Sequence, residues 1–157
     1  MVNYKNLMKI EKALKYDLKE ILKLQKLAYL SEAEIYNDYS IPPLTQTLDE
    51  IKEDFSFQLF LKSVIKSKII GSVRAYKGDD TCYIGKLIVY PNFQNKGIGT
   101  KLLKEIETKF DNVKRYELFT GYKSERNLYL YQKLGYHQFR SEKINENLQL
   151  IYLEKNK

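Results

Sequence analysis

The chain has 157 residues, of which 43% are hydrophobic and 30% are charged, and 27 Lys and Arg against 20 Asp and Glu give a net charge of +7. This length and composition predict one domain over residues 1–157 and exclude a disordered or collagen-like chain. No stretch approaches the ~20 apolar residues of a membrane-spanning helix, and no signal-peptide pattern is visible. We therefore expect a cytoplasmic protein without a membrane partner.

Cys82 and His137 are the only cysteine and histidine in the sequence. One thiol and one imidazole do not make a zinc site, so no metal is expected. Cys82 lies in an apolar, strand-like run, which favours a packing role over nucleophilic catalysis. The basic charge could attract a nucleic acid, but the lysines are spread along the chain and no nucleic-acid-binding motif appears. A solvated lysine-rich surface is the favoured interpretation, and a small anionic ligand fits as well.

Two helix-start signals stand in the first third of the chain. Asp17 with Glu20, and Thr47 with Glu50, have the spacing of an N-cap residue and the acidic partner that completes a capping box. Apolar residues at helical spacing follow both signals. The segment between the two helices is predicted to be irregular or at most a short helix, which Pro42-Pro43 ends.

From residue 58 onward the apolar pattern alternates as in strands and twice returns to a helical period. The whole pattern predicts the order βααβββαβαββ. The expected strands are residues 8–13, 58–65, 68–76, 81–90, 116–120, 137–142 and 148–154, and the expected helices are about 17–30, 47–55, 96–110 and 125–134. Strand hairpins followed by a β-α-β unit imply a mixed sheet with helices on both faces.

The most informative segment, residues 87–100 (LIVYPNFQNKGIGT), joins a strand to an amphipathic helix. Gly97 and Gly99 stand at the helix start, where backbone N–H groups can approach a phosphate closely, and Lys96 and Lys101 add positive charge. The third glycine of the dinucleotide fingerprint and the Gly-Lys-Ser/Thr of a P-loop are both absent from this segment. A tight turn with no ligand is the alternative interpretation.

The spacing Gln94-x-x-Gly97-x-Gly99, after a strand that ends Leu87-x-Val89-x-Pro91, resembles the acetyl-CoA-binding segment of the GNAT (Gcn5-related N-acetyltransferase) superfamily. Residues 127–136 (NLYLYQKLGY) resemble the "LYxKxGF" segment of the same family. The predicted element order also matches the family topology over essentially the whole chain. The resemblance implies an α/β (α+β) GNAT fold: a mixed, mostly antiparallel seven-stranded sheet with about four helices on both faces, splayed between strands 4 and 5.

The resemblance further implies how acetyl-CoA is held. The pantetheine arm pairs with the backbone of Leu87, Ile88 and Val89, where a bulge aims the N–H of Ile88 or Val89 at the thioester carbonyl. The CoA pyrophosphate lies on the loop and helix start, formed by Gln94, Asn95, Lys96, Gly97, Ile98, Gly99 and Thr100. Many members also carry an asparagine seven residues before the catalytic tyrosine. That position is Ser124 here, and Asn127 is the favoured CoA contact instead.

Tyr131 matches the family tyrosine that contacts CoA and protonates its departing thiolate, so it is the expected general acid. The alternative is that Tyr131 is one more aromatic on the apolar face of its helix. The general base is less visible, because the fourth strand carries no carboxylate. Glu32 and Glu34, in the segment that borders the acceptor side of this fold, are the candidate bases, and a solvated loop carboxylate is the alternative for each.

The leading interpretation is an acetyl-CoA-dependent N-acetyltransferase that acts on a primary amine by direct attack in a ternary complex. Acetyl-CoA is then the cosubstrate, the acceptor is a small-molecule or peptide amine, and a homodimer is compatible with the sequence. Two alternatives stay open: a GNAT-fold sensor or scaffold that binds acetyl-CoA without transfer, and a basic nucleic-acid-binding module. Tyr131 and the intact glycine loop favour the enzyme.

Overall fold

The computed structural model describes residues 7–157. The strands are β1 (Lys9–Lys12), β2 (Leu59–Ile65), β3 (Lys68–Gly78), β4 (Thr81–Val89), β5 (Arg115–Gly121), β6 (His137–Lys143) and β7 (Gln149–Asn156). The helices are α2 (Leu18–Ala28), α3 (Leu30–Tyr36), α4 (Pro42–Thr45), α5 (Leu48–Phe57), α6 (Ile98–Lys109) and α7 (Glu125–Lys133), with short 3-10 turns η1 (Lys15–Asp17) and η2 (Pro91–Phe93). No helix in this part of the chain is long and apolar enough to cross a membrane.

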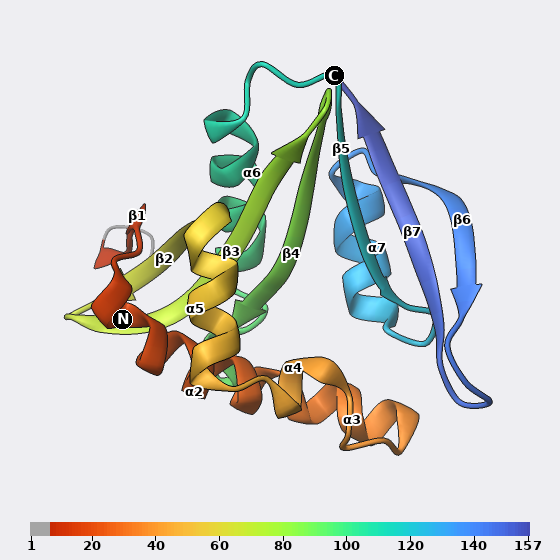
Figure 1. Ribbon diagram of the computed structural model, residues 1–157, viewed down its shortest axis with the longest axis horizontal. Coiled ribbons are helices and arrows are strands. Elements are labelled where there is room, and N and C mark those ends of the chain that lie inside the picture. Colours follow the sequence, from red (N-terminus) through yellow and green to blue (C-terminus); the bar gives the residue numbers. More distant parts are fainter. Residues whose placement is uncertain (1–6) are drawn as a thin grey trace.

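The seven strands form one mixed sheet in the order β1-β2-β3-β4-β5-β7-β6. β4 and β5 run parallel and pair over three residues, the last pair being Tyr83 with Glu117, whereas the other neighbouring strands are antiparallel. Beyond that pair β4 and β5 diverge into an open V (Figure 1). The predicted seven-stranded mixed sheet, splayed between its fourth and fifth strands, is confirmed.

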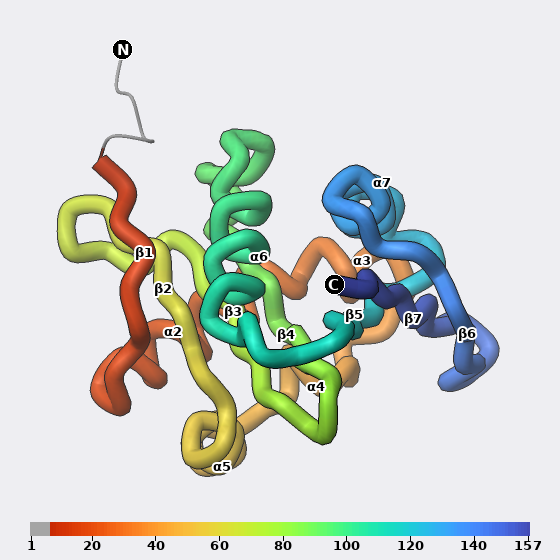
Figure 2. Tube along the Cα trace, turned by 90° about the horizontal axis from the view of Figure 1, so that it is seen from above, coloured from red at the N-terminus to blue at the C-terminus, as the bar shows by residue number. Residues whose placement is uncertain are grey.

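Helices cover both faces of the sheet, with α6 and α7 on one face and α2 and α5 on the other (Figures 1 and 2). Leu102, Leu103 and Ile106 of α6 are buried in the first core, and Leu18 and Ile51 are buried in the second. These are the apolar positions whose helical spacing the sequence shows. Burial of this kind is the main favourable term in folding.

The cysteine has the packing role that its apolar surroundings predict. Cys82 is fully buried in the core between the sheet and α6. Burial raises the pKa of its thiol to about 12, because the thiolate would lose its hydration, so the thiol stays protonated and unreactive at neutral pH.

One of the two predicted capping boxes is confirmed, and at the other the predicted residue, Asp17, stands at the N-cap position without forming the expected bonds. At α5, Thr47 Oγ1 accepts from Glu50 N at 3.2 Å and Glu50 Oε1 accepts from Thr47 N at 2.9 Å. At α2, Asp17 forms no cap bond to the helix. Its carboxylate accepts from Leu14 N at 2.8 Å and pairs with the buried Lys62 at 2.8 Å, since a buried ammonium requires an anionic partner more strongly than an exposed helix end does.

The segment predicted to be irregular contains two helices, α3 and α4. α3 ends where Asn37 takes a left-handed conformation, with φ of 48°. Pro42-Pro43 begins α4 and does not end a helix, because proline is well suited to the first turn, where an N–H has no intrahelical acceptor. α3 lies beneath the open end of the V and carries both candidate bases (Figure 1).

Candidate active site

The loop between β4 and α6 ends in a backbone geometry suited to an anion. Gly97 is the N-cap of α6 with φ of 81°, a left-handed conformation that favours glycine. The first intrahelical bond joins Lys101 N to Gly97 O at 3.1 Å. Within the described residues, the preceding N–H groups of Ile98, Gly99 and Thr100 form no hydrogen bond. They are therefore available to a ligand at the positive end of the helix dipole.

Gln94 fixes this loop against its neighbours. Its Nε2 donates to Val89 O at 3.2 Å, and its Oε1 accepts from Arg126 Nη1 in the first turn of α7. Gly99 packs close to the same helix, since a Cβ built on it would lie 3.6 Å from Leu130. The loop thus sits between the two helices that flank the V. The sequence analysis missed Arg126, which adds a positive charge beside the loop.

β4 contains the bulge that the resemblance implies. Gly85 lies opposite Arg74 and Ile88 lies opposite Ser72, so the two residues between them, Lys86 and Leu87, face a single residue of β3. Lys86 takes a left-handed conformation with φ of 50°. The bulge changes which side chains of β4 face each side of the sheet: Ile84 belongs to the core under α6, whereas Ile88 belongs to the core under α2.

Backbone hydrogen bonds show which N–H groups of β4 face the V. Tyr90 N donates to Ile70 O at 2.7 Å, and hydrogen-bonded pairs alternate along an antiparallel ladder. Ile88, two residues earlier, therefore directs its backbone groups toward Ser72 of β3. Val89 directs its own away from β3, in agreement with the bond from Gln94 to its carbonyl oxygen. Of the two candidate oxyanion donors, this geometry favours Val89.

Tyr131 is buried in α7, and its hydroxyl forms no hydrogen bond to another described residue. Burial raises the pKa of its phenol well above the ordinary value, and Tyr29 and Glu32 raise it further. Burial likewise raises the pKa of Tyr29 to about 12. Among the groups that raise the pKa of Tyr131 is thus one of the two candidate bases, Glu32.

The two candidate bases have different surroundings. Glu32 is half-buried, and its Oε2 accepts from Ser124 Oγ at the start of α7. Ser124 Oγ in turn accepts from Tyr36 Oη at 2.9 Å, and Tyr36 Oη accepts from the backbone N–H of Lys123 at 2.9 Å. Glu34, two residues along α3, is exposed. Of the two candidate bases, Glu32 is therefore the one held by a contact at the start of α7, the helix that carries Tyr131.

The same contacts bear on the expected CoA-binding side chain. Ser124 is buried and its hydroxyl is already used by Tyr36 and Glu32. Asn127 is half-buried, and its Nδ2 donates to Thr120 Oγ1 at 3.2 Å, which leaves its Oδ1 available. This arrangement agrees with the choice of Asn127 over Ser124.

A cluster that the sequence analysis missed lies where β4 and β5 separate. Arg74 of β3 is buried, its Nη2 donates to Gln25 and to Gln46, and its Nη1 lies 3.4 Å from Asp54 Oδ2. Lys86 and Arg74 both line a cleft at this place. A signal was present in the sequence: an arginine between Val73 and Ala75, and a lysine that interrupts the apolar run of residues 84–89.

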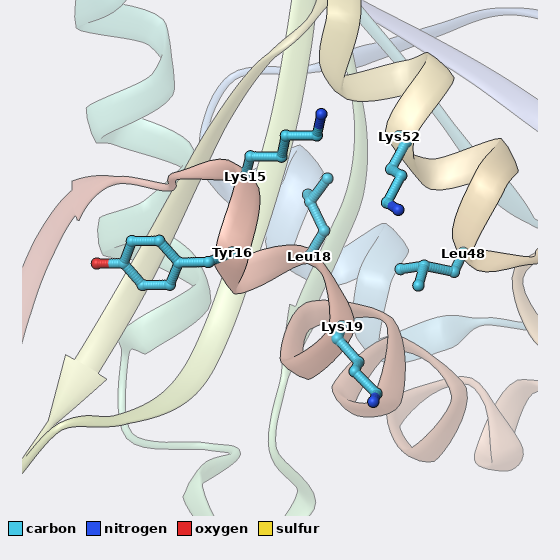
Figure 3. A pocket seen from close by; sticks show the side chains of 6 residues that line it. All are labelled: Lys15, Tyr16, Leu18, Lys19, Leu48 and Lys52. Carbon is cyan, nitrogen blue, oxygen red and sulfur yellow. The ribbon is translucent and has the colours of Figure 1, made fainter.

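A separate hollow lies between η1, α2 and α5 (Figure 3). Its lining residues are Lys15, Tyr16, Leu18, Lys19, Leu48 and Lys52. It draws no residue from β4, β5 or α6, and its charged groups are surface lysines. Across the described residues, no group of three or more His, Cys, Asp or Glu could hold a metal ion.

The splayed sheet, the bulged strand and the loop before α6 define a class: the GNAT-fold acetyltransferases. Residues 18–136 match the Acetyltransferase (GNAT) family, and the chain belongs to that family. The structure is similar to a GNAT family acetyltransferase from Elizabethkingia anophelis with acetyl-CoA bound, at 25% identity and a TM-score of 0.69 over 97% of this chain and 99% of that one. It is also similar to the PaiA N-acetyltransferase from Thermoplasma acidophilum in complex with coenzyme A, at 22% identity and a TM-score of 0.71 over 96% and 99% of the two chains.

The fold is also similar to that of the ribosomal-protein-S18-alanine N-acetyltransferase from Escherichia coli, at a lower identity of 14% and a TM-score of 0.78 over 95% of this chain and 93% of that one. A curated relative is the UPF0157 protein YqkA of Bacillus subtilis, which is 28% identical over 132 residues, or 84% of this chain. The chain spans 38% of the length of that relative.

Proposed function

We propose that the protein is an N-acetyltransferase that moves the acetyl group of acetyl-CoA to a primary amine by direct attack in a ternary complex. The observation that carries the proposal is the junction of β4 and α6, where a bulged strand faces an open V and leads into a left-handed Gly97 and free helix N–H groups. Two structural neighbours with this fold hold CoA or acetyl-CoA.

The pyrophosphate of CoA would accept hydrogen bonds from the N–H groups of Ile98, Gly99 and Thr100, with Arg126 and the loop lysines nearby. The pantetheine arm would lie in the V and pair with the backbone of Leu87 and Val89, which face away from β3. Asn127 would contact the arm from α7. Such pairing would satisfy the backbone groups of β4 that form no hydrogen bonds with β5 in this part of the sheet.

In the reaction the amine nitrogen attacks the thioester carbonyl, and its lone pair forms the new C–N bond. The carbonyl oxygen becomes an oxyanion, which a backbone N–H at the bulge stabilises. The C–S bond then breaks, and the thiolate takes a proton from the Tyr131 hydroxyl. Burial raises the pKa of a thiol held beside Tyr131 as it raises that of the phenol, because both charged forms lose hydration.

The attacking amine must also lose a proton, and Glu32 is the carboxylate best placed to receive it. Its contact with Ser124 holds one carboxylate oxygen, and its half-buried position near Tyr131 borders the space where the acyl group would lie. A water molecule between the amine and Glu32 would serve as well as direct contact.

The alternative with an observation in its favour is a sensor or scaffold that binds acetyl-CoA without transfer. The geometry of the loop accounts for acetyl-CoA binding and does not by itself imply turnover. We further propose that residues 1–157 act as one domain, since every described strand belongs to one sheet. A cytoplasmic location and a homodimer stay predictions of the sequence.

The test combines binding and turnover. Calorimetry with acetyl-CoA, with CoA and with a DNA oligonucleotide should show specific binding of the first two, and CoA should displace any bound oligonucleotide. CoA release in the presence of a panel of primary amines, with the product mass increased by one acetyl group, should then establish transfer. Acetyl-CoA binding without transfer to any amine would favour the sensor, and oligonucleotide binding that persists at saturating CoA would contradict the small-molecule function.

A further inference from the structure

A cleft of about 320 Å³ opens where β4 and β5 stop pairing. Beyond the last pair, Tyr83 with Glu117, the next residues of both strands form its walls. Asp54 of α5 and Gln58, which directly follows that helix, border it, which places it on the face of the sheet opposite α6 and α7. Its lining residues are Asp54, Gln58, Arg74, Tyr76, Tyr83, Ile84, Gly85, Lys86, Glu117, Leu118, Phe119 and Tyr152. Such a volume suits a small molecule.

The two cations that line this cleft are incompletely paired. Glu117 is engaged by Arg115, whose Nη1 lies 3.0 Å from it, and the carboxylate of Asp54 accepts from Gln46 Nε2 at 2.8 Å and lies near Arg74. Lys86 has no carboxylate within ion-pair distance among the described residues. Arg74 therefore lies near one carboxylate of the cleft, that of Asp54, whereas Lys86 is paired with none.

Arg74 is held in place rather than neutralised. Its Nη2 donates to the neutral side-chain oxygens of Gln25 and Gln46, and its Cζ lies 4.7 Å from the centre of the Phe60 ring. Its Nη1 is buried and forms no hydrogen bond, although it lies 3.4 Å from Asp54. A buried donor without a hydrogen bond is costly to a fold, and a ligand oxygen in the cleft would satisfy it.

The bulge in β4 is what directs Lys86 into the cleft. Without it the alternation of the strand would turn residue 86 to the same side as Ile84, in the core under α6. A half-buried lysine in a left-handed conformation is unfavourable by itself, and desolvation together with Arg74 lowers the pKa of Lys86 to about 8. Unfavourable features of this kind gather at functional sites.

We propose that this cleft binds the acceptor, and that the acceptor is a small amine carrying an anionic group, a carboxylate or a phosphate, which Arg74 and Lys86 hold. The inference rests on the proposed N-acetyltransferase function. Guanidinium and ammonium groups are the side chains that recognise such oxyanions. Tyr76 and Tyr83, stacked with ring centroids 5.2 Å apart, supply an apolar wall for the rest of the molecule.

The position of Lys86 limits the distance between the anion and the amine. Lys86 directly precedes Leu87, whose backbone belongs to the stretch proposed to hold the thioester. An oxyanion bound by Lys86 therefore lies close to the reacting carbonyl, and the amine that attacks it must be only a few bonds from its own anionic group. Amino acids and aminoalkyl phosphates have this arrangement, whereas polyamines do not.

Matched pairs of amines test the inference. Each pair contains an amine with an anionic group and its counterpart without that group: phenylalanine and phenethylamine, lysine and cadaverine, O-phosphoethanolamine and ethanolamine. We expect kcat/KM to be at least about 10-fold higher for the anionic member of at least one pair. The amino-acid pairs and the phosphate pair distinguish the two sources of the anion. A preference in every pair for the member without the anionic group, with turnover present, would overturn the anionic acceptor while leaving the N-acetyltransferase intact.

Variants then assign the effect to the cleft. Lys86→Met should lower kcat/KM for the anionic member at least about 10-fold, mainly through KM, with little change for the counterpart without the anionic group. Lys77→Met, at an exposed lysine of β3 outside the cleft, is the matched control and should change neither value. An equal loss for both members in Lys86→Met would contradict an anion contact. Arg74→Gln is a second variant, to be used only if circular dichroism shows that it folds.

A binding experiment keeps the inference testable if no amine is acetylated, a result that would count against the proposed function itself. Calorimetry on the protein saturated with CoA compares each pair as ligands. Tighter binding of the anionic member, lost in Lys86→Met, would support the anion site independently of turnover. Equal affinity within every pair would overturn it.

Discussion

Ser124, the residue before α7, donates a hydrogen bond from its Oγ to Oε2 of Glu32 in α3. α3 belongs to the part of the chain before β4, whereas α7 follows β5, so this contact joins the two halves of the sheet where β4 and β5 do not pair. Tyr36 adds a second contact to Ser124 at 2.9 Å. The same bond that connects the halves therefore positions the candidate base.

Ser124→Ala should lower the free energy of unfolding by about 1–3 kcal/mol. It removes the hydroxyl that bonds the buried Tyr36 and the half-buried Glu32, and both side chains lose that partner. Gly121→Ala should act on the same contact, because the new Cβ would lie 2.0 Å from Tyr36 Oη and displace that side chain. Urea denaturation measures both. Ser31→Ala, at an exposed hydroxyl in the same helix as Glu32, is the control, and a Ser124→Ala protein as stable as this control would contradict the role of the contact.

Tyr131→Phe should lower kcat by about 10²–10⁴-fold, the usual contribution of a general acid, with little change in acetyl-CoA affinity. Phenylalanine keeps the buried ring and removes a hydroxyl that bonds no other described residue, so the fold should be unaffected. Steady-state kinetics and calorimetry provide the two measurements. A kcat within twofold of the wild-type value, with chemistry limiting turnover, would rule out Tyr131 as the essential acid.

Glu32→Gln and Glu34→Gln separate the two candidate bases. Glutamine at position 32 can still accept from Ser124 but cannot take a proton, so kcat should fall about 10²-fold or more while the KM for acetyl-CoA stays similar. Glu34→Gln should leave kcat within about twofold, since that side chain is exposed. Equal kcat in both variants would remove Glu32 from the mechanism and favour water as the route for the proton.

Gly97→Val should weaken acetyl-CoA binding at least about 10-fold, which corresponds to about 1.4 kcal/mol. A β-branched residue is strained at φ of 81° and would shift the N–H groups at the start of α6. Gly97→Asn is the matched variant, because asparagine tolerates the left-handed conformation and should retain much of the affinity. Unchanged affinity in a folded Gly97→Val protein, measured by calorimetry, would end this interpretation of the loop.

The low pKa of Lys86 predicts a dependence of stability on pH. Burial and the charge of Arg74 lower that pKa from 10.5 to about 8, although Asp54 opposes the shift. Between pH 8 and 10.5 the unfolded chain still holds this proton and the folded chain has lost it, so the contribution of Lys86 to stability rises with pH across that window.

Lys86→Met should therefore stabilise the protein by about 1–3 kcal/mol at pH 7, where the wild type must bury a charged ammonium, and by much less at pH 10. Urea denaturation at the two pH values measures the difference, with Lys77→Met as the control for the loss of one exposed lysine. A stability difference between Lys86→Met and wild type that does not change with pH would show that the ammonium is not desolvated.

The order of the strands and the glycine loop could be predicted because both depend on the spacing of residues that are close in the sequence. Leu102, Leu103 and Ile106 show the helical period of α6, and Gly97 and Gly99 mark its start, so neither feature depends on distant parts of the chain. The cap at Asp17 failed for the opposite reason. Lys62, 45 positions later, lies beside Asp17 only in the folded protein, and its ammonium attracts the carboxylate away from the helix end.

The sequence by itself determined the family, the order of the strands and the glycine loop, since each rests on the spacing of neighbouring residues, and the resemblance to the family made Tyr131 the candidate acid. Only the tertiary structure distinguished Glu32 from Glu34, because the difference is a contact with Ser124 across the V. It alone also brought Arg74 and Lys86 to one cleft, because a bulge reverses the alternation of β4 and turns a lysine out of the core. Position along the chain predicts periodicity, whereas burial and charge partners are set by the packing of distant segments.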